Sequence, residues 1–207
     1  MESSLKLSYS RIFNLTLGEF FVIYKVYRCY DRGGVVLGWL NGFDRKVFKF
    51  TMGLSHESFM HRCMWLVSRS GDWGKIWLAI CLFLLYWPQN RRTSEVCMIT
   101  LLFTTVLGEG VLKRIFRRPR PYVTHGPATL TIPEPNGFSF PSGHTASSVA
   151  CARILAPLNP WLAAAVYAYA GLMAVSRVYL KVHYVTDVVA GSVIGIICAK
   201  LVKWYFM

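Results

Sequence analysis

Charged side chains are scarce in this sequence of 207 residues. They make up 16% of the chain, against roughly 25% in ordinary soluble domains. Hydrophobic residues account for 54% and aromatic residues for 15%, and the mean hydropathy is +0.38. This shortage of charge favours a membrane protein over a soluble globular domain, and the length suits one domain or one compact membrane bundle.

Acidic residues are the rarer kind: 10 Asp and Glu stand against 23 Lys and Arg, for a formal net charge of +13. Nucleic acid, anionic lipid headgroups or a phosphorylated substrate could each attract so basic a chain. Nucleic-acid binders usually carry their basic residues on a polar surface, whereas here they lie between apolar segments. We therefore expect a lipid or phosphate partner and no nucleic acid.

Paired cysteine motifs are also missing. No two of the six cysteines form a CxxC pair, which disfavours a zinc site or a disulfide framework. Most stand among apolar residues, where a thiol acts as a small hydrophobic group. We expect buried free thiols at Cys29, Cys63, Cys81, Cys97, Cys151 and Cys198.

Long apolar runs without charge are few. A spanning helix needs about 20 predominantly apolar residues, and only Ile154–Ser176 is free of charge, with Pro157 and Pro160 interrupting it. The overall texture predicts an all-α, integral-membrane helical bundle with about 5–6 transmembrane helices. Five predicted spans lie near residues 73–88, 95–113, 143–157, 160–178 and 186–205.

The first 71 residues differ from the rest, because charges are scattered every few positions. We predict amphipathic helices at the membrane interface, rich in basic and aromatic residues. A short first span near residues 12–30 is the alternative, although it would have to accommodate Glu19, Lys25 and Arg28. The predicted organisation is an interfacial region, 1–71, followed by a membrane core, 72–207.

Three polar clusters stand near the ends of the predicted spans. A proline-rich loop over about residues 114–141 separates the first two clusters, and such a loop cannot cross hydrocarbon. With five consecutive spans, this loop and the connection after the fourth span open on the same side of the membrane. The clusters that should meet there are Lys113-x6-Arg120-Pro121, Pro141-Ser142-Gly143-His144 and Ser176-Arg177-x5-His183-x3-Asp187.

Each cluster has a chemistry of its own. Converging Arg and Lys side chains grip phosphate oxygens. Pro-Ser-Gly-His before an apolar run indicates a helix start, which attracts anions, with Ser142 as N-cap or phosphate ligand. His183 and Asp187 are four residues apart and would share one face of a helix. A carboxylate on one ring nitrogen would leave the other nitrogen free to attack.

Together the three clusters resemble the signature motifs of the type 2 phosphatidic acid phosphatase (PAP2) family. All three match in full and in order, and the resemblance covers about residues 72–205. It implies a phosphatase that uses no metal and no cofactor. By this resemblance His183 is the nucleophile, Asp187 its orienting partner and His144 the general acid. The implied phosphate-binding residues are Lys113, Arg120, Ser142, Gly143 and Arg177.

Catalysis by two histidines requires His144 charged and His183 neutral at the start, which predicts a pH optimum between their pKa values. Glu109, one turn before Lys113, is either a functional acid at membrane depth or a brace for that lysine. The additional basic residues Arg114, Arg117 and Arg118 are interpreted as attracted to lipid headgroups, with direct substrate contact as the alternative.

The predicted reaction is dephosphorylation of a membrane lipid through a phosphohistidine. Phosphatidic acid, phosphatidylglycerol phosphate, a polyprenyl diphosphate and a lipid A-type phosphate are all open as substrates. The alternatives are a lipid-to-lipid phosphotransferase, a non-catalytic lipid-binding or transport protein, and a vanadate-dependent peroxidase. The sequence carries no signal for oligomeric state.

Sidedness is predicted from basic residues at the other end of the spans, among them Arg91, Arg92, Lys200 and Lys203. The positive-inside rule places that end in the cytoplasm. We therefore expect a bacterial inner-membrane protein whose active site faces the periplasm or the outside.

Overall fold

The computed structural model describes residues 35–54, 58–124, 130 and 132–207. The predicted amphipathic helices and the alternative span before residue 35 lie outside the described residues, as does Cys29. The chain divides into two compact units, Met1–Phe43 and Asp44–Met207. The helical bundle and all the predicted site residues belong to the second unit.

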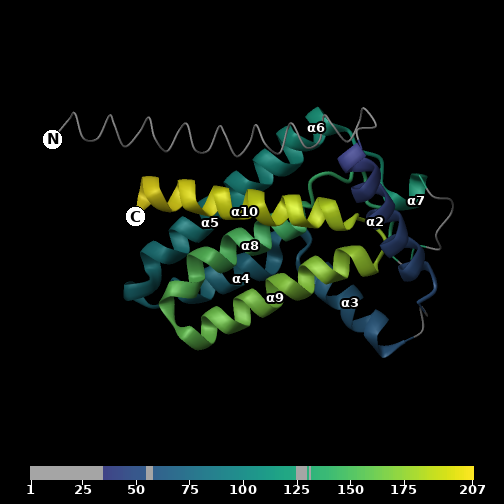
Figure 1. Cartoon of the computed structure of the whole chain (residues 1–207). Helices are drawn as coiled ribbons and strands as arrows, with labels where there is room; N and C mark the ends of the chain where they lie inside the picture. Colours follow the sequence, from purple (N-terminus) through teal and green to yellow (C-terminus); the bar gives the residue numbers. More distant parts are fainter. Residues whose placement is uncertain (1–34, 55–57, 125–129, 131) are drawn as a thin grey trace, which may run out of the picture. The chain divides into compact units, whose positions relative to one another are not determined.

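Every regular element in the described part of the chain is a helix (Figure 1). The α-helices are α2 (Val35–Met52), α3 (Phe59–Ser70), α4 (Lys75–Leu84), α5 (Arg91–Thr105), α6 (Lys113–Phe116), α7 (Pro121–Thr124), α8 (Gly143–Leu155), α9 (Pro160–Tyr179) and α10 (Val185–Phe206). Four short helices join them: η1 (Asp72–Gly74), η2 (Pro88–Asn90), the π-helix η3 (Val106–Leu112) and η4 (Ala156–Leu158).

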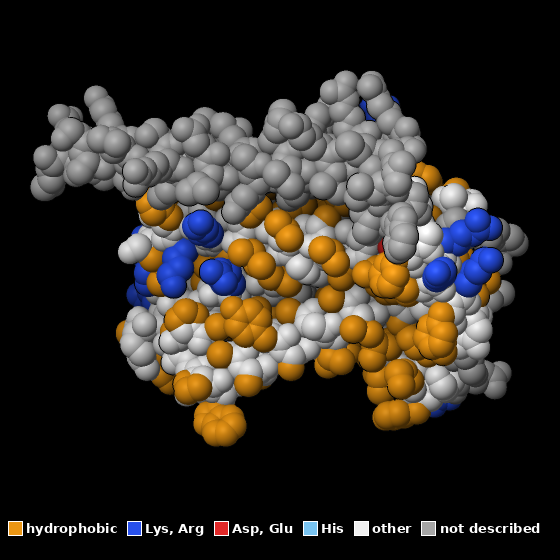
Figure 2. Space-filling view, in the orientation of Figure 1, with side chains coloured by type: hydrophobic (Ala, Val, Ile, Leu, Met, Phe, Trp, Pro, Cys, Tyr) orange, Lys and Arg blue, Asp and Glu red, His pale blue; other side chains and the backbone are white. Residues whose placement is uncertain are grey.

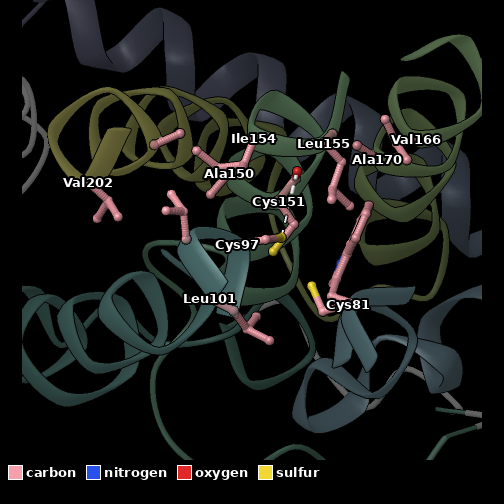
Figure 3. Packing of buried hydrophobic residues seen from close by; sticks show 14 residues of the cluster. Cys81, Cys97, Leu101, Ala150, Cys151, Ile154, Leu155, Val166, Ala170 and Val202 are labelled. Carbon is pink, nitrogen blue, oxygen red and sulfur yellow. Dashed lines mark hydrogen bonds between the residues drawn. The ribbon is translucent and has the colours of Figure 1, made fainter. Parts of the chain in front are cut away.

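Helix α8 is the centre of the unit. It packs on α10, α5 and α9, while α3 packs on α9 and α4 on α5. Figure 3 shows the apolar core around it, where Ile154 and Leu155 of α8 meet side chains of the neighbouring helices. Helix α8, which begins at Gly143 of the second cluster, is therefore fixed in place by this core.

Small residues let α10 approach α8 closely. A Cβ added at Gly191 would stand 2.6 Å from the carbonyl oxygen of Ser142, and one at Gly195 would collide with the carbonyl oxygen of Ala146. Two glycines four residues apart lie on one helix face, and in membrane helices such a pair permits backbone contact. This contact fixes the beginning of α8 against the first turns of α10.

Among the residues that the structure describes, three segments are long and apolar enough to cross a membrane: Pro88–Thr124, Pro160–Tyr179 and Val185–Phe206. They contain three of the predicted spans. The other two correspond to α4 and α8, of 10 and 13 residues, which measure roughly 15 and 20 Å against a hydrocarbon core of about 30 Å. The all-α membrane bundle is confirmed, and the number of five to six spans stays a prediction.

The surface of the bundle fits a membrane. Figure 2 shows hydrophobic side chains across the middle of one face and Lys and Arg side chains gathered towards its two ends. Large apolar groups such as Phe83, Leu102 and Val189 are exposed. A soluble protein seldom exposes so much apolar area, whereas lipid tails would cover it.

Four of the five described cysteines are buried as predicted, and Cys63 departs from the prediction. Cys81, Cys97, Cys151 and Cys198 are buried and Cys63 is half-buried, and all five are free thiols. The Cys97 thiol faces the carbonyl oxygen of Cys151 at 4.0 Å inside the core (Figure 3). These thiols fill space between helices.

Candidate active site

The three sequence clusters meet at the end of the bundle where α10 begins, beside α6 and α7 (Figure 1). The Arg120 guanidinium Nη1 lies 3.5 Å from Nε2 of His183. The backbone N–H of Ser142 donates to the carbonyl oxygen of Asp187 at 3.1 Å. Segments far apart in the sequence are thus joined, as the topology argument predicted. The set is also buried: Lys113, Arg120, Ser142, Arg177, His183 and Asp187 are each at most 7% exposed.

The first cluster begins where the helix widens. The π-helix η3 carries Glu109 into contact with Lys113, whose Nζ donates to Oε2 at 2.7 Å. The brace that the sequence allowed therefore forms. The glutamate also lies directly against the Cα of Gly143, where a Cβ would collide with its carboxylate oxygen. The same acid thus meets both the first and the second cluster.

Arg120 is fixed by backbone carbonyl groups. Its Nη1 donates to the carbonyl oxygen of Val182 at 3.0 Å, and its Nε to that of Gly137 at 3.1 Å. Just before it, Arg117 ends α6 in the left-handed region, with φ of 48°. The chain therefore turns sharply, and the guanidinium bridges the loop before α8 and the connection between α9 and α10.

Ser142 stands at the N-cap position of α8 but does not cap it through its side chain. Its hydroxyl pairs instead with Oγ1 of Thr145 at 3.0 Å. Of the two roles allowed by the sequence, the capping hydrogen bond is thus not formed. The first turn of α8, which starts at Gly143, keeps its positive dipole end at the site.

His144 pairs with an acid that the sequence analysis did not single out. Its Nε2 lies 3.0 Å from Oδ1 of Asp72, a half-exposed residue at the start of η1. The hydrogen bond with His144 lowers the pKa of Asp72 below its usual value. The carboxylate in turn favours a protonated imidazole, but burial and the charge of Arg177 outweigh it and lower the pKa of His144 below its usual value.

His183 and Asp187 face each other, though not as two residues of one helix. His183 lies in the turn before α10, whose N-cap is Tyr184, and Asp187 occupies the first turn. The Asp187 carboxylate oxygen Oδ2 accepts the Tyr184 backbone N–H at 2.9 Å and lies 3.5 Å from Nδ1 of His183. The latter distance exceeds the usual range of a hydrogen bond. The sequence spacing therefore predicted Asp187 as the partner of His183. Asp187 is held in place by its capping hydrogen bond to Tyr184, which sets its distance from the ring.

The His183 ring is surrounded by positive charge. Burial, followed by the nearby charges of Arg120 and Arg177, holds the pKa of His183 well below its usual value. Lys113 and His144 contribute in the same direction. All the cationic residues predicted for the site therefore act on one neutral imidazole.

The sequence matches the family model described as "PAP2 superfamily" over residues 94–207. The chain belongs to the PAP2 superfamily. The matched region contains the three clusters together with most of α5 and the whole of α8, α9 and α10.

Curated relatives in the PAP2 superfamily carry the names of lipid phosphatases. The chain is 29% identical over 155 residues to the undecaprenyl-diphosphatase of Sulfolobus acidocaldarius, covering 74% of each chain. It is 37% identical over 128 residues to phosphatidylglycerophosphatase B of Bacillus subtilis, covering 56% of this chain and 60% of that protein.

Two solved structures share the fold. The crystal structure of LpxE from Aquifex aeolicus matches with a TM-score of 0.68 at 27% identity, covering 77% of this chain and 94% of the other. A PAP2-type phosphatidylglycerolphosphate phosphatase from Bacillus subtilis matches with a TM-score of 0.69 at 22% identity, covering 92% and 94%.

Arg118 is a further member of this PAP2 site, and its interpretation as a lipid-attracted base is wrong. It is 3% exposed and forms ion pairs with Asp187 and, at 2.9 Å, with Oδ2 of Asp44. Asp44 also accepts the Thr186 backbone N–H at 3.2 Å. The arginine therefore joins α2 to the start of α10 beside Asp187. Arg114 and Arg117 are exposed, and their attraction to lipid headgroups stays a prediction.

The region before residue 72 also contributes. Arg177 donates through Nη1 to the hydroxyl of Ser68 in α3, and Asp44 comes from α2. Neither contact could be predicted from the sequence around Ser68 or Asp44, because a lone Ser or Asp in a charged segment is usually exposed to solvent. Only the tertiary fold identifies these partners.

The acids and histidines do not form a metal cage in the described residues. No three His, Cys, Asp or Glu side chains there gather in a group that could hold a metal ion. The absence of metal from the mechanism remains a prediction.

Proposed function

We propose that this chain removes the phosphate of a phosphorylated membrane lipid, with His183 as the nucleophile. The single observation that carries the proposal is the convergence of Lys113, Arg120 and Arg177 on the His183 ring. Fixed cations of this kind stabilise the negative charge on the equatorial oxygens of a phosphoryl group in transfer.

Nε2 of His183 is the attacking atom in this proposal. Nδ1 faces Asp187, whereas Nε2 faces the Arg120 guanidinium. A phosphate held by that guanidinium would stand in front of Nε2. The ring is neutral because its pKa is lowered, so its lone pair is available for attack.

The reaction then has two steps. In the first, the His183 nitrogen bonds to phosphorus, the bond from phosphorus to the lipid oxygen breaks, and His144 donates its proton to that oxygen. The lipid alcohol departs and a phosphohistidine remains. In the second, water gives a proton to His144 and attacks phosphorus, which releases phosphate and restores His183.

Asp72 and Asp187 position the two rings. Asp72 favours the protonated form of His144 through the 3.0 Å contact, against burial and the charge of Arg177, which lower the pKa of His144. Asp187 orients His183. Arg118, which holds Asp187 from behind, is a positioning residue. Ser142 and Gly143 supply the start of α8 as a further contact for the phosphate.

We also propose a location and an organisation. The exposed apolar band and the three spanning segments support a membrane protein, and the basic residues opposite the site favour an outward-facing active site in an inner membrane. Residues 1–71 would form an interfacial region that also supplies Asp44 and Ser68 to the site of the core, 72–207.

A lipid panel with a chelator present tests the function. The purified chain in mixed micelles would be offered phosphatidic acid, phosphatidylglycerol phosphate, a polyprenyl diphosphate and lipid A phosphate, and free phosphate measured. We expect release from at least one lipid with EDTA present. Release that stops with EDTA would contradict the metal-independent mechanism.

Two further measurements separate the alternatives. Acid-quenched turnover followed by peptide mass spectrometry should place an acid-labile phosphate on His183. Phosphate recovered on a second lipid, with none free, would establish the phosphotransferase alternative instead.

A further inference from the structure

A second basic site lies at the end of the bundle opposite His144. The last turn of α8, the first half of α9 and the end of α10 enclose a groove of about 420 Å³. Arg153, Lys200 and Lys203 line it together with Tyr167 and Trp204. Because α8 has 13 residues, roughly 20 Å of helix separates this groove from the phosphate cradle.

The three cations of the groove have no carboxylate partner among the described residues. No ion pair within 4.0 Å involves Arg153, Lys200 or Lys203. In contrast, Glu95, an acid of the same end, pairs with Arg92 at 3.7 Å. The groove therefore presents concentrated positive charge that the described chain does not neutralise.

Its walls are suited to a membrane interface. Tyr167 and Trp204 are 46% and 39% exposed, and amphipathic rings of this kind favour the headgroup level of a bilayer. Ala156, Pro157 and Ala199 complete the lining and add no acid. A ligand that fits both surfaces has an anionic group and an adjoining apolar part.

We propose that this groove binds the headgroup of an anionic phospholipid in the leaflet opposite the active site. The phosphodiester would meet the two lysines and Arg153, and the acyl chains would leave along the exposed apolar surface of α9 and α10. Basic side chains near a membrane surface attract anionic lipids at about 1 kcal/mol each. Because the three cations line one groove with two aromatic side chains, a headgroup could contact all of them at once.

Tryptophan quenching tests the site directly. The full chain would be placed in phosphatidylcholine vesicles with and without brominated phosphatidylglycerol. The part of the quenching that disappears in Trp204→Phe reports on the groove. We expect preferential quenching of Trp204 by brominated phosphatidylglycerol and much less by brominated phosphatidylcholine.

Charge variants give the matched comparison. Lys203→Gln and Lys200→Gln should each weaken phosphatidylglycerol binding about fivefold. Arg91→Gln removes one exposed cation outside the groove and should leave the quenching unchanged. Each variant should hydrolyse micellar substrate like the unaltered chain, which keeps this test independent of the phosphatase chemistry.

Three outcomes would overturn the proposal. An equal loss in Arg91→Gln would assign the binding to general surface charge. Equal quenching by both brominated lipids would show that the cations serve the fold or the helix dipoles only. Full competition by inorganic phosphate would identify a free-anion site instead of a lipid site.

Discussion

Clustered cations occupy both ends of the bundle, and the two clusters are built differently. At the end that holds the candidate active site, Lys113, Arg120 and Arg177 are buried and held by specific contacts, such as Arg120 on the Val182 carbonyl. At the opposite end Arg153, Lys200 and Lys203 are exposed and have no carboxylate partner in the described chain. Buried cations can be positioned for one phosphoryl group, whereas exposed ones retain mobile side chains suited to variable headgroups.

The largest expected effect comes from removing the one group that the buried cations surround. His183→Ala should lower kcat by on the order of 10⁴- to 10⁶-fold, as loss of a nucleophile does in other covalent mechanisms. Turnover of the best lipid substrate would be measured by phosphate release. Lipid binding and the melting temperature should remain, and turnover near the original rate would place the nucleophile elsewhere.

The next effect contrasts a buried arginine with an exposed one. Arg118→Met would leave Asp44 and Asp187 buried without their cation, which costs about 3–5 kcal/mol in comparable sites. Arg153→Met, at the exposed end, should change stability by at most about 0.5 kcal/mol. Unfolding in mixed SDS micelles would measure both, and equal effects would remove the distinction between the two ends.

Gly195 tests the helix contact that supports the catalytic end. Gly195→Ala would drive a methyl group into the Ala146 carbonyl oxygen, and overpacking of this kind costs about 1–3 kcal/mol. Gly171 is the matched control, because nothing lies within 4 Å of an added Cβ there. Gly171→Ala should therefore stabilise α9 by up to about 1 kcal/mol. The two changes are compared by the same SDS unfolding, and destabilisation by both would point to helix-wide effects instead of the α8–α10 contact.

The smallest expected effect concerns the pH profile. Asp72 has a lowered pKa because of its bond to His144, so its carboxylate is charged at neutral pH and favours protonated His144. Asp72→Asn should move the alkaline limb of the kcat profile to lower pH, because His144 then loses its proton earlier. Glu134→Gln removes an exposed acid in the loop before α8 and serves as control. An unmoved limb in Asp72→Asn would exclude this role.

Sequence reasoning found the parts of the site that depend on local pattern. Pro141-Ser142-Gly143-His144 predicted a helix start, and α8 begins at Gly143. The spacing of His183 and Asp187 predicted their proximity, which the structure has at 3.5 Å. Alternation of span and loop predicted that the clusters would share one end. These inferences needed only helix geometry and topology.

Other parts depended on tertiary contacts that no local pattern carries. Arg118 stands among three other arginines of one short segment, and its burial depends on Asp44, far away in α2. Asp72 meets His144 only because η1 lies beside α8. The number of spans stays a prediction, because α4 and α8, of 10 and 13 residues, are shorter than the hydrocarbon core is thick.

The widened turn at Val106–Leu112 sets the rotational phase of the residues after it. Each residue of a regular α-helix advances the chain by about 100° around the axis, and a π-turn absorbs one additional residue. If the same residues formed a regular α-helix instead, the additional residue would turn Lys113 by about 100° from its inward direction, and Arg120 and the proline loop with it. The wide turn therefore helps to aim the first cluster, although its own residues need not touch a phosphate.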